Sequence, residues 1–161
     1  MKKQGSVCDY TAARNAELVR NFNAAIRAAK ILDLDKICGE VANSPASRFF
    51  ISEERAYELI IARRRRGHWT ISIPLRVEMI EEIERRAESR LRSGKAATLR
   101  DAVHEAVNSP APRFYLTPRS CRTLVYATIH ESHMRRLRER IENAKTALIS
   151  AHTTTPTSPN R

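Results

Sequence analysis

One seven-residue pattern occurs twice in this chain. Residues 43–49 read Asn-Ser-Pro-Ala-Ser-Arg-Phe, and residues 108–114 read Asn-Ser-Pro-Ala-Pro-Arg-Phe. A shift of 65 positions superposes the two without an insertion and also aligns the helical patterns on either side. Self-similarity at a fixed period indicates a repeated structural unit. We therefore predict a tandem duplication, in which each copy contains a helix, a second helix, an extended connector and a third helix.

The residues that both connectors share are expected to determine the fold. Proline lacks an amide hydrogen and biases the residue before it away from helix, so each connector should end the preceding helix. In an extended segment alternate side chains face opposite sides, which favours burial of one aromatic ring. A nucleic-acid role, with rings stacking on bases, is the alternative. The predicted structural connector residues are Asn43, Pro45, Arg48, Phe49, Asn108, Pro110, Arg113 and Phe114.

The rest of the sequence predicts a mainly α protein. Good helix formers dominate and only four glycines are present. Apolar residues at three- and four-residue steps predict helices over about 10–29, 34–42, 53–66, 76–92, 99–107 and 118–150. Asp33, Ser52, Thr98 and Thr117 are the expected N-caps. Apolar and polar residues alternate over 69–75, which predicts one short strand-like segment there or an extended linker.

These elements divide the chain into five parts. We expect a flexible N-terminus over 1–8, repeat copy 1 over 9–67 and an extended inter-copy segment over 68–75. Repeat copy 2, with its long C-terminal helix, covers 76–150, and a disordered Thr/Pro/Ser-rich tail covers 151–161. No signal-peptide pattern and no apolar run of membrane-spanning length occurs. The expectation is a cytoplasmic protein without a membrane partner.

The charge of the chain points to polyanions. Lys and Arg number 29 against 18 Asp and Glu, giving a net charge of +11. Such a charge favours nucleic acid through Coulomb attraction and counterion release. An acidic protein partner, or plain solvation of the basic faces, is the alternative. The predicted phosphate-contacting residues are Arg63, Arg64, Arg65, Arg66, Arg119, Arg122, Arg135 and Arg136.

Other patterns are expected to shape the surface. Glu81, Glu82, Glu84 and Glu88 lie among arginines, which predicts exposed pairs along one helix. Apolar residues over 134–148 follow a short heptad-like seam, through which a homo-oligomer could form. The connectors are too long for a helix-turn-helix, and residues 69–107 match a ribbon-helix-helix only loosely.

The sequence offers little catalytic chemistry. The three cysteines, Cys8, Cys38 and Cys121, are widely spaced, so we expect neither a disulfide framework nor a zinc site. His130 and His133 lack a third ligand at a telling spacing, and no glycine-rich phosphate loop occurs. We therefore predict no catalytic residue, metal or cofactor, and not an enzyme. The expected function is a nucleic-acid-binding accessory or regulatory protein, DNA- or RNA-binding, from a bacterial or mobile-element setting. The alternative is a structural or scaffolding subunit of a helical oligomeric assembly with an acidic protein partner.

Overall fold

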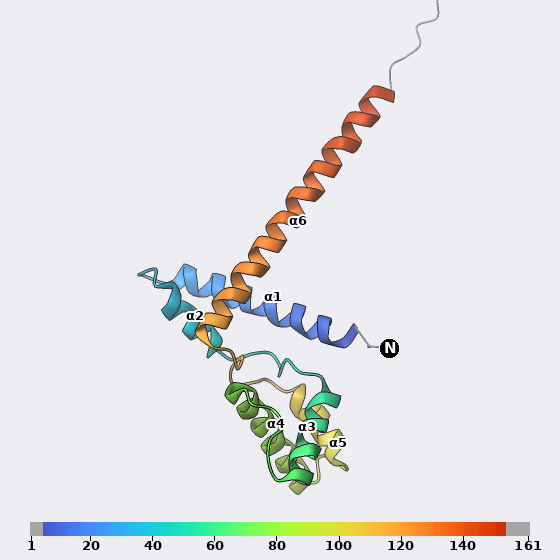
Figure 1. Ribbon diagram of the computed structural model, residues 1–161. Coiled ribbons are helices and arrows are strands. Elements are labelled where there is room, and N and C mark those ends of the chain that lie inside the picture. Colours follow the sequence, from blue (N-terminus) through green and yellow to red (C-terminus); the bar gives the residue numbers. More distant parts are fainter. Residues whose placement is uncertain (1–4, 154–161) are drawn as a thin grey trace, which may run out of the picture. The chain divides into compact units, whose positions relative to one another are not determined.

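The computed structural model describes residues 5–153, which form six helices and no strand (Figure 1). The chain is divided into two compact units, of which the first ends at Val125 and the second begins at Tyr126. The sixth helix starts in the first unit and forms the described part of the second. The helices are α1 (Gly5–Ala28), α2 (Leu34–Ala42), α3 (Glu53–Arg66), α4 (Pro74–Arg92), α5 (Leu99–Val107) and α6 (Pro118–Thr153).

Side-chain caps set the starts of four helices, as the sequence predicts. The side chains of Asp33, Ser52 and Thr98 accept hydrogen bonds from backbone N–H groups three residues further on. Thr117 does the same for Ser120, and Pro118 follows it as the first residue of α6. At the other end of α3, Gly67 adopts a φ of 76°, a left-handed conformation that glycine accepts without a Cβ clash.

Two expected boundaries differ from the structure. The strand predicted near 69–75 is not confirmed, because no segment of the described chain pairs with it. The segment is an irregular link, and its apolar residues Trp69 and Ile71 alternate with polar ones because they pack against the core. The link is also shorter than expected, since Pro74 already begins α4. At the N-terminus, α1 begins at Gly5, within the stretch expected to be flexible, and residues 1–4 lie outside the described residues. Most of the expected disordered tail, residues 154–161, also lies outside them.

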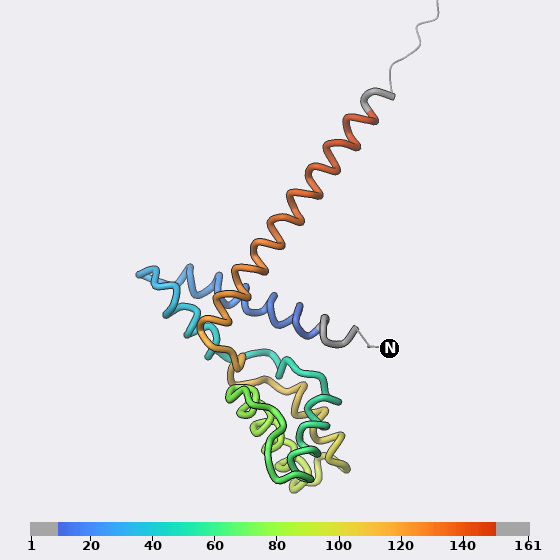
Figure 2. Tube along the Cα trace, in the orientation of Figure 1, coloured from blue at the N-terminus to red at the C-terminus, as the bar shows by residue number. Residues whose placement is uncertain are grey.

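The two connectors lie side by side in antiparallel directions (Figure 2). The backbone N–H of Ala46 donates to the carbonyl of Ala111 at 3.0 Å, and that of Ala111 donates to Ala46 at 2.9 Å. One step along, Phe49 N–H donates to Val107 and Phe114 N–H donates to Ala42, both at 3.1 Å. In each pair of bonds, the donor and acceptor of one bond are the positions equivalent to those of the other after a shift of 65 residues. The contacts are therefore reciprocal.

The first unit has two halves, one containing α1 and α2 and the other containing α4 and α5. Each connector leads the helix that follows it to the half to which the preceding helix does not belong. Glu53 of α3 contacts His104 of α5 at 2.6 Å, so α3 packs with helices that come later in the chain. The start of α6 returns to α2, where Arg122 pairs with Asp35 at 2.9 Å. Tyr57 lies 65 positions before Arg122, and Arg100 lies 65 positions after Asp35. These two equivalent residues are also in contact, because the Arg100 guanidinium lies over the Tyr57 ring.

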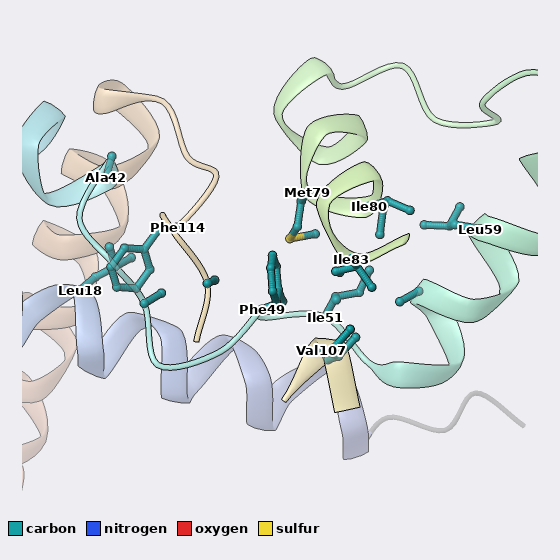
Figure 3. Close-up of a cluster of buried hydrophobic side chains, with 14 of the residues drawn as sticks. Leu18, Ala42, Phe49, Ile51, Leu59, Met79, Ile80, Ile83, Val107 and Phe114 are labelled. Atoms are coloured by element: carbon teal, nitrogen blue, oxygen red, sulfur yellow. The ribbon is translucent and has the colours of Figure 1, made fainter. Parts of the chain in front are cut away.

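Aromatic residues of the connectors fill the core of both halves. Figure 3 shows Phe114 beside Leu18 and Ala42, and Phe49 pointing toward Met79 of α4. Phe49 and Phe114 are buried, whereas their neighbours Phe50 and Tyr115 are half-buried. The expected alternation within the connectors is therefore present. Burial of this apolar surface is the main favourable contribution to folding of the first unit.

Candidate nucleic-acid surface and ligand cavity

The arginine run that closes α3 is divided between two roles. Arg63 donates to Glu84 at 2.7 Å and its guanidinium lies 4.7 Å from the centre of the Trp69 ring. Arg64 donates to Glu84 at 2.8 Å and to Glu88 at 2.9 Å. These two arginines tie α3 to α4. Glu84 is only 6 % exposed, so the prediction of a surface pair within one helix is wrong for this residue.

The reason lies in the packing of α3 on α4. Glu84 follows the core residue Ile83 on the same helix, and the end of α3 covers it. A carboxylate that leaves water needs charged donors, which Arg63 and Arg64 supply. Glu82 does pair within α4, with Arg85 and Arg86, both at 2.7 Å. Burial alone would raise the pKa of Glu82, but the hydrogen bonds and charges of those two arginines together lower it.

Other predicted arginines are exposed to solvent. Arg65 and Arg66 at the end of α3, and Arg119 at the start of α6, form no ion pair with any described residue. Arg122 differs from them because it pairs with Asp35. Within the second unit, Arg135 and Arg136 are exposed and likewise lack a carboxylate partner among residues 126–153. The structure thus leaves five of the eight predicted arginines available for an external anion.

The arginines that the two connectors share have contacts inside the fold. Arg48 donates to the carbonyl of Phe49 at 3.2 Å and lies 4.3 Å from the centre of the Tyr10 ring. Arg113 pairs with Glu78, contacts the side chain of Asn43 and lies over the Tyr115 ring. Asn108 donates to Glu53 at 2.7 Å. Pro45 and Pro110, which are exposed, flank the paired residues Ala46 and Ala111.

A cavity of about 560 Å³ lies in the first unit where the two connectors meet α1, α3 and α4. We call it the connector cavity. Residues from both connectors line it, and the equivalent positions Phe50 and Tyr115 both take part. No Asp or Glu occurs among the described residues that line it. The side chains that give it its character are Tyr10, Arg14, Phe50, Arg55, Arg76 and Phe114.

Stacked rings form one side of this cavity. Phe50 and Phe114 are nearly parallel, with an interplanar angle of 6° and centroids 5.9 Å apart. Phe49 and Tyr115 stack at 6.0 Å. Tyr115 has a φ of 55°, an uncommon conformation for a residue with a side chain. Burial raises the pKa of the Tyr115 hydroxyl, and the charge of Glu82 adds to this.

Sequence reasoning missed the connector cavity. Arg14, Arg55 and Arg76 lie in three different helices and belong to no charge run. Only the arrangement of the helices brings them to one place. A signal was available for Phe50 and Tyr115, because each directly follows another aromatic residue. In an extended segment two adjacent rings face opposite sides, so one ring of each pair should lie away from the core.

Buried thiols form a further contact inside the first unit. Cys38 of α2 and Cys121 of α6 are both free thiols with no exposed surface, and their side chains contact each other. Burial, with a smaller contribution from Cys38, raises the pKa of Cys121 to about 11. These residues therefore pack as small apolar groups.

The described residues contain neither a helix that could cross a membrane nor a cluster that could hold a metal ion. None of the helices between Gly5 and Thr153 combines the length and apolar character that crossing a bilayer requires. In the same part of the chain, no three His, Cys, Asp or Glu side chains gather around a point where a metal ion could bind. No protein-family model, curated protein or solved structure matches this chain.

Proposed function

We propose that this chain is a nucleic-acid-binding accessory or regulatory protein that contacts mainly phosphate through arginine. The supporting observation is the set of exposed arginines that have no carboxylate partner among the described residues, Arg65 and Arg66 foremost. They stand in the last turn of α3 beside two arginines that are already paired. Four arginines in one helical turn exceed what is needed to stabilise the C-terminus of α3, so the unpaired ones can contact phosphates.

We also propose that the fold arose by tandem duplication with the third helices exchanged between the copies. The support is that backbone contacts recur after a shift of 65 residues. Phe49 N–H donates to Val107, and Phe114 N–H donates in the same way to Ala42. Two similar halves offer two similar surfaces, which suits a repeating polymer. The copies differ in their charges, so the two surfaces would not bind equally.

Fluorescence anisotropy with labelled duplex and single-stranded oligonucleotides tests the proposed function. We expect the logarithm of the binding constant to fall linearly with the logarithm of the salt concentration. The double variant Arg65→Gln/Arg66→Gln should weaken binding across sequences and flatten the slope by about 2 on duplex DNA. Binding that is absent at low salt, or that does not depend on salt, would contradict the proposal.

A charge-matched control separates a defined surface from net charge. Arg20 and Arg27 are exposed residues of α1 without an ion pair to any described residue. Arg20→Gln/Arg27→Gln removes the same charge from a different helix. We expect it to weaken binding less than the substitution of Arg65 and Arg66. Equal losses would remove Arg65 and Arg66 from the proposed surface.

The second candidate function is a subunit of a helical assembly. Leu137 and Ile141 of α6 are 41 % and 48 % exposed, and they lie four residues apart on one face of the helix. Exposed apolar residues in a heptad-like pattern are typical of a helix that pairs with another copy. We propose that a homo-oligomer forms through residues 134–148. Sedimentation velocity should show a defined oligomer that Leu137→Asp/Ile141→Asp converts to monomer; a wild-type monomer at all concentrations would exclude it.

A further inference from the structure

We propose that the connector cavity binds a nucleotide, with the base against the aromatic floor and the phosphate at the arginine rim. This site is separate from the exposed arginines of the proposed function, and neither depends on the other. The cavity volume of about 560 Å³ falls in the range of about 300–1,000 Å³ typical of small-molecule sites. It is larger than a phosphate ion requires, so the ligand has a further part.

The floor of the cavity fits a planar ring. Ile51, Met79 and Phe114 line it and are buried, and Phe50 stacks on Phe114 while keeping part of its own surface open. Nucleobases stack on aromatic side chains because every base has a π-face. An aliphatic chain would fill the same volume without using the parallel rings. The pair of rings therefore favours an aromatic ligand.

The rim of the cavity fits an anion. Among the described residues, the side chain of Arg14 bonds only to the side-chain oxygen of Asn15, at 3.2 Å. The side chain of Arg76 has no hydrogen bond or ion pair to any of them. Arg55 shares its charge with Glu58 at 3.3 Å. Burial lowers the pKa of Arg14, which means that its cationic form is partly desolvated. The planar guanidinium group matches the oxygens of a phosphate.

Two helices begin at the same cavity. Ser52, the N-cap of α3, and Ile73, the N-cap of α4, both line it. Ile73 cannot cap with its side chain, so the first turn of α4 lacks that acceptor. The positive end of a helix dipole favours an anion at this position. The helix starts and the arginines thus act in the same direction.

Charge in the cavity comes from residues that the two halves do not share. Arg14 corresponds to Met79 and Arg76 corresponds to Thr11, 65 positions apart, and all four line the cavity. At these two pairs of equivalent positions, one member is therefore an arginine and the other is a neutral residue. The strained backbone of Tyr115 also lies here. Such outliers concentrate at binding sites, where the surrounding structure holds them.

Isothermal titration calorimetry of the full chain with adenosine monophosphate tests the inference. We expect saturable binding of one equivalent, at least tenfold tighter than binding of adenosine, ribose 5-phosphate or inorganic phosphate. Arg14→Gln/Arg76→Gln should lower the affinity at least tenfold. The charge-matched Arg65→Gln/Arg66→Gln should change it less than twofold. Arg76→Glu, at an exposed position, provides the same test should the double variant not fold.

A competition experiment distinguishes a free nucleotide from a nucleotide within a nucleic-acid strand as the ligand. A 5′-phosphorylated oligothymidylate that displaces adenosine monophosphate assigns the cavity to a nucleotide within a strand; failure to displace it assigns a free nucleotide. No binding up to millimolar concentration, equal binding of adenosine, or equal losses in both double variants would overturn the inference. Tighter binding of dodecanoate than of the nucleotide would also overturn it. If the protein still bound oligonucleotides when any of these results was obtained, the proposed function would remain supported while the inference about the cavity would fail.

Discussion

The backbone N–H of Phe49 donates to the carbonyl oxygen of Val107 at 3.1 Å, which places the first connector at the end of α5. The side chain of Phe49 is 1 % exposed and points toward Met79 of α4 (Figure 3). Phe114 has the reciprocal position, with its N–H on Ala42 at the end of α2. Each phenylalanine therefore fills the core of the half to which its own preceding helix does not belong.

Truncation of these rings should destabilise opposite halves. Phe49→Ala and Phe114→Ala should each lower the free energy of unfolding by about 3–5 kcal/mol, because a large cavity remains in a packed core. In native-state hydrogen exchange, Phe49→Ala should lower protection most in α4 and α5, and Phe114→Ala most in α1 and α2. Phe50→Ala, at a half-buried position, should cost less than either. Loss of protection in α1 and α2 on truncation of Phe49 would refute the exchanged arrangement.

Glu84 should matter more to stability than any other glutamate of α4. Glu84→Gln replaces a buried carboxylate that accepts from both Arg63 and Arg64, and we expect a loss of about 1–3 kcal/mol in urea unfolding. Glu88→Gln is the matched control, because its more exposed carboxylate should contribute less than about 1 kcal/mol. The difference should persist in 0.5 M salt, since ions screen the buried group poorly. Equal effects of the two substitutions would contradict the assigned burial of Glu84.

The helices could be predicted from the sequence because their signals are local. Asp33, Ser52 and Thr98 act through the backbone three residues ahead, and Gly67 acts through its own conformation. Apolar periodicity also identified the buried faces. It does not say which helix covers which face, since any apolar stripe can pack against another. For this reason the pairing of α3 with α5, and of α6 with α2, appears only in the structure.

The candidate sites show the same limit. The run from Arg63 to Arg66 is visible in the sequence, but the division of its members depends on Glu84 in another helix. Arg14 and Arg76 are 62 positions apart and become neighbours of one cavity only through the crossing of the connectors. Two single residues that come together only in the folded chain produce no periodic pattern in the sequence. A charge cluster in sequence is therefore a weaker guide than the same charges after folding.

The thiol of Cys121 should make the protein less stable in alkali. Its pKa is about 11 in the folded chain against 9.0 for an unperturbed thiol, so the folded state holds the proton more tightly. The resulting stabilisation, about 2–3 kcal/mol from about two pH units, is complete below pH 9 and is lost as the pH rises toward 11. Urea unfolding from pH 7.5 to 10.5 under reducing conditions measures it.

The variant Cys121→Ala is the control for this pH dependence. It should be less stable at neutral pH because a buried side chain is shortened, but its stability should fall less steeply above pH 9. In a Cys8→Ser background, Cys38 and Cys121 should react with a thiol reagent at pH 8 only after unfolding. Rapid labelling of the folded chain, or an equal alkaline loss in the variant, would be inconsistent with burial of this thiol.

Backbone strain at Tyr115 predicts an inverted order of two substitutions. At a φ of 55° an alanine retains the left-handed penalty of about 1–2 kcal/mol, which glycine does not have. Both Tyr115→Ala and Tyr115→Gly lose the ring stacked on Phe49. We therefore expect the glycine variant to be more stable than the alanine variant by about 1 kcal/mol in urea unfolding. Phe50, the equivalent position in the first connector, has no positive φ, so there alanine should be the more stable replacement. The same order at both positions would show that the strain at Tyr115 is absent in solution.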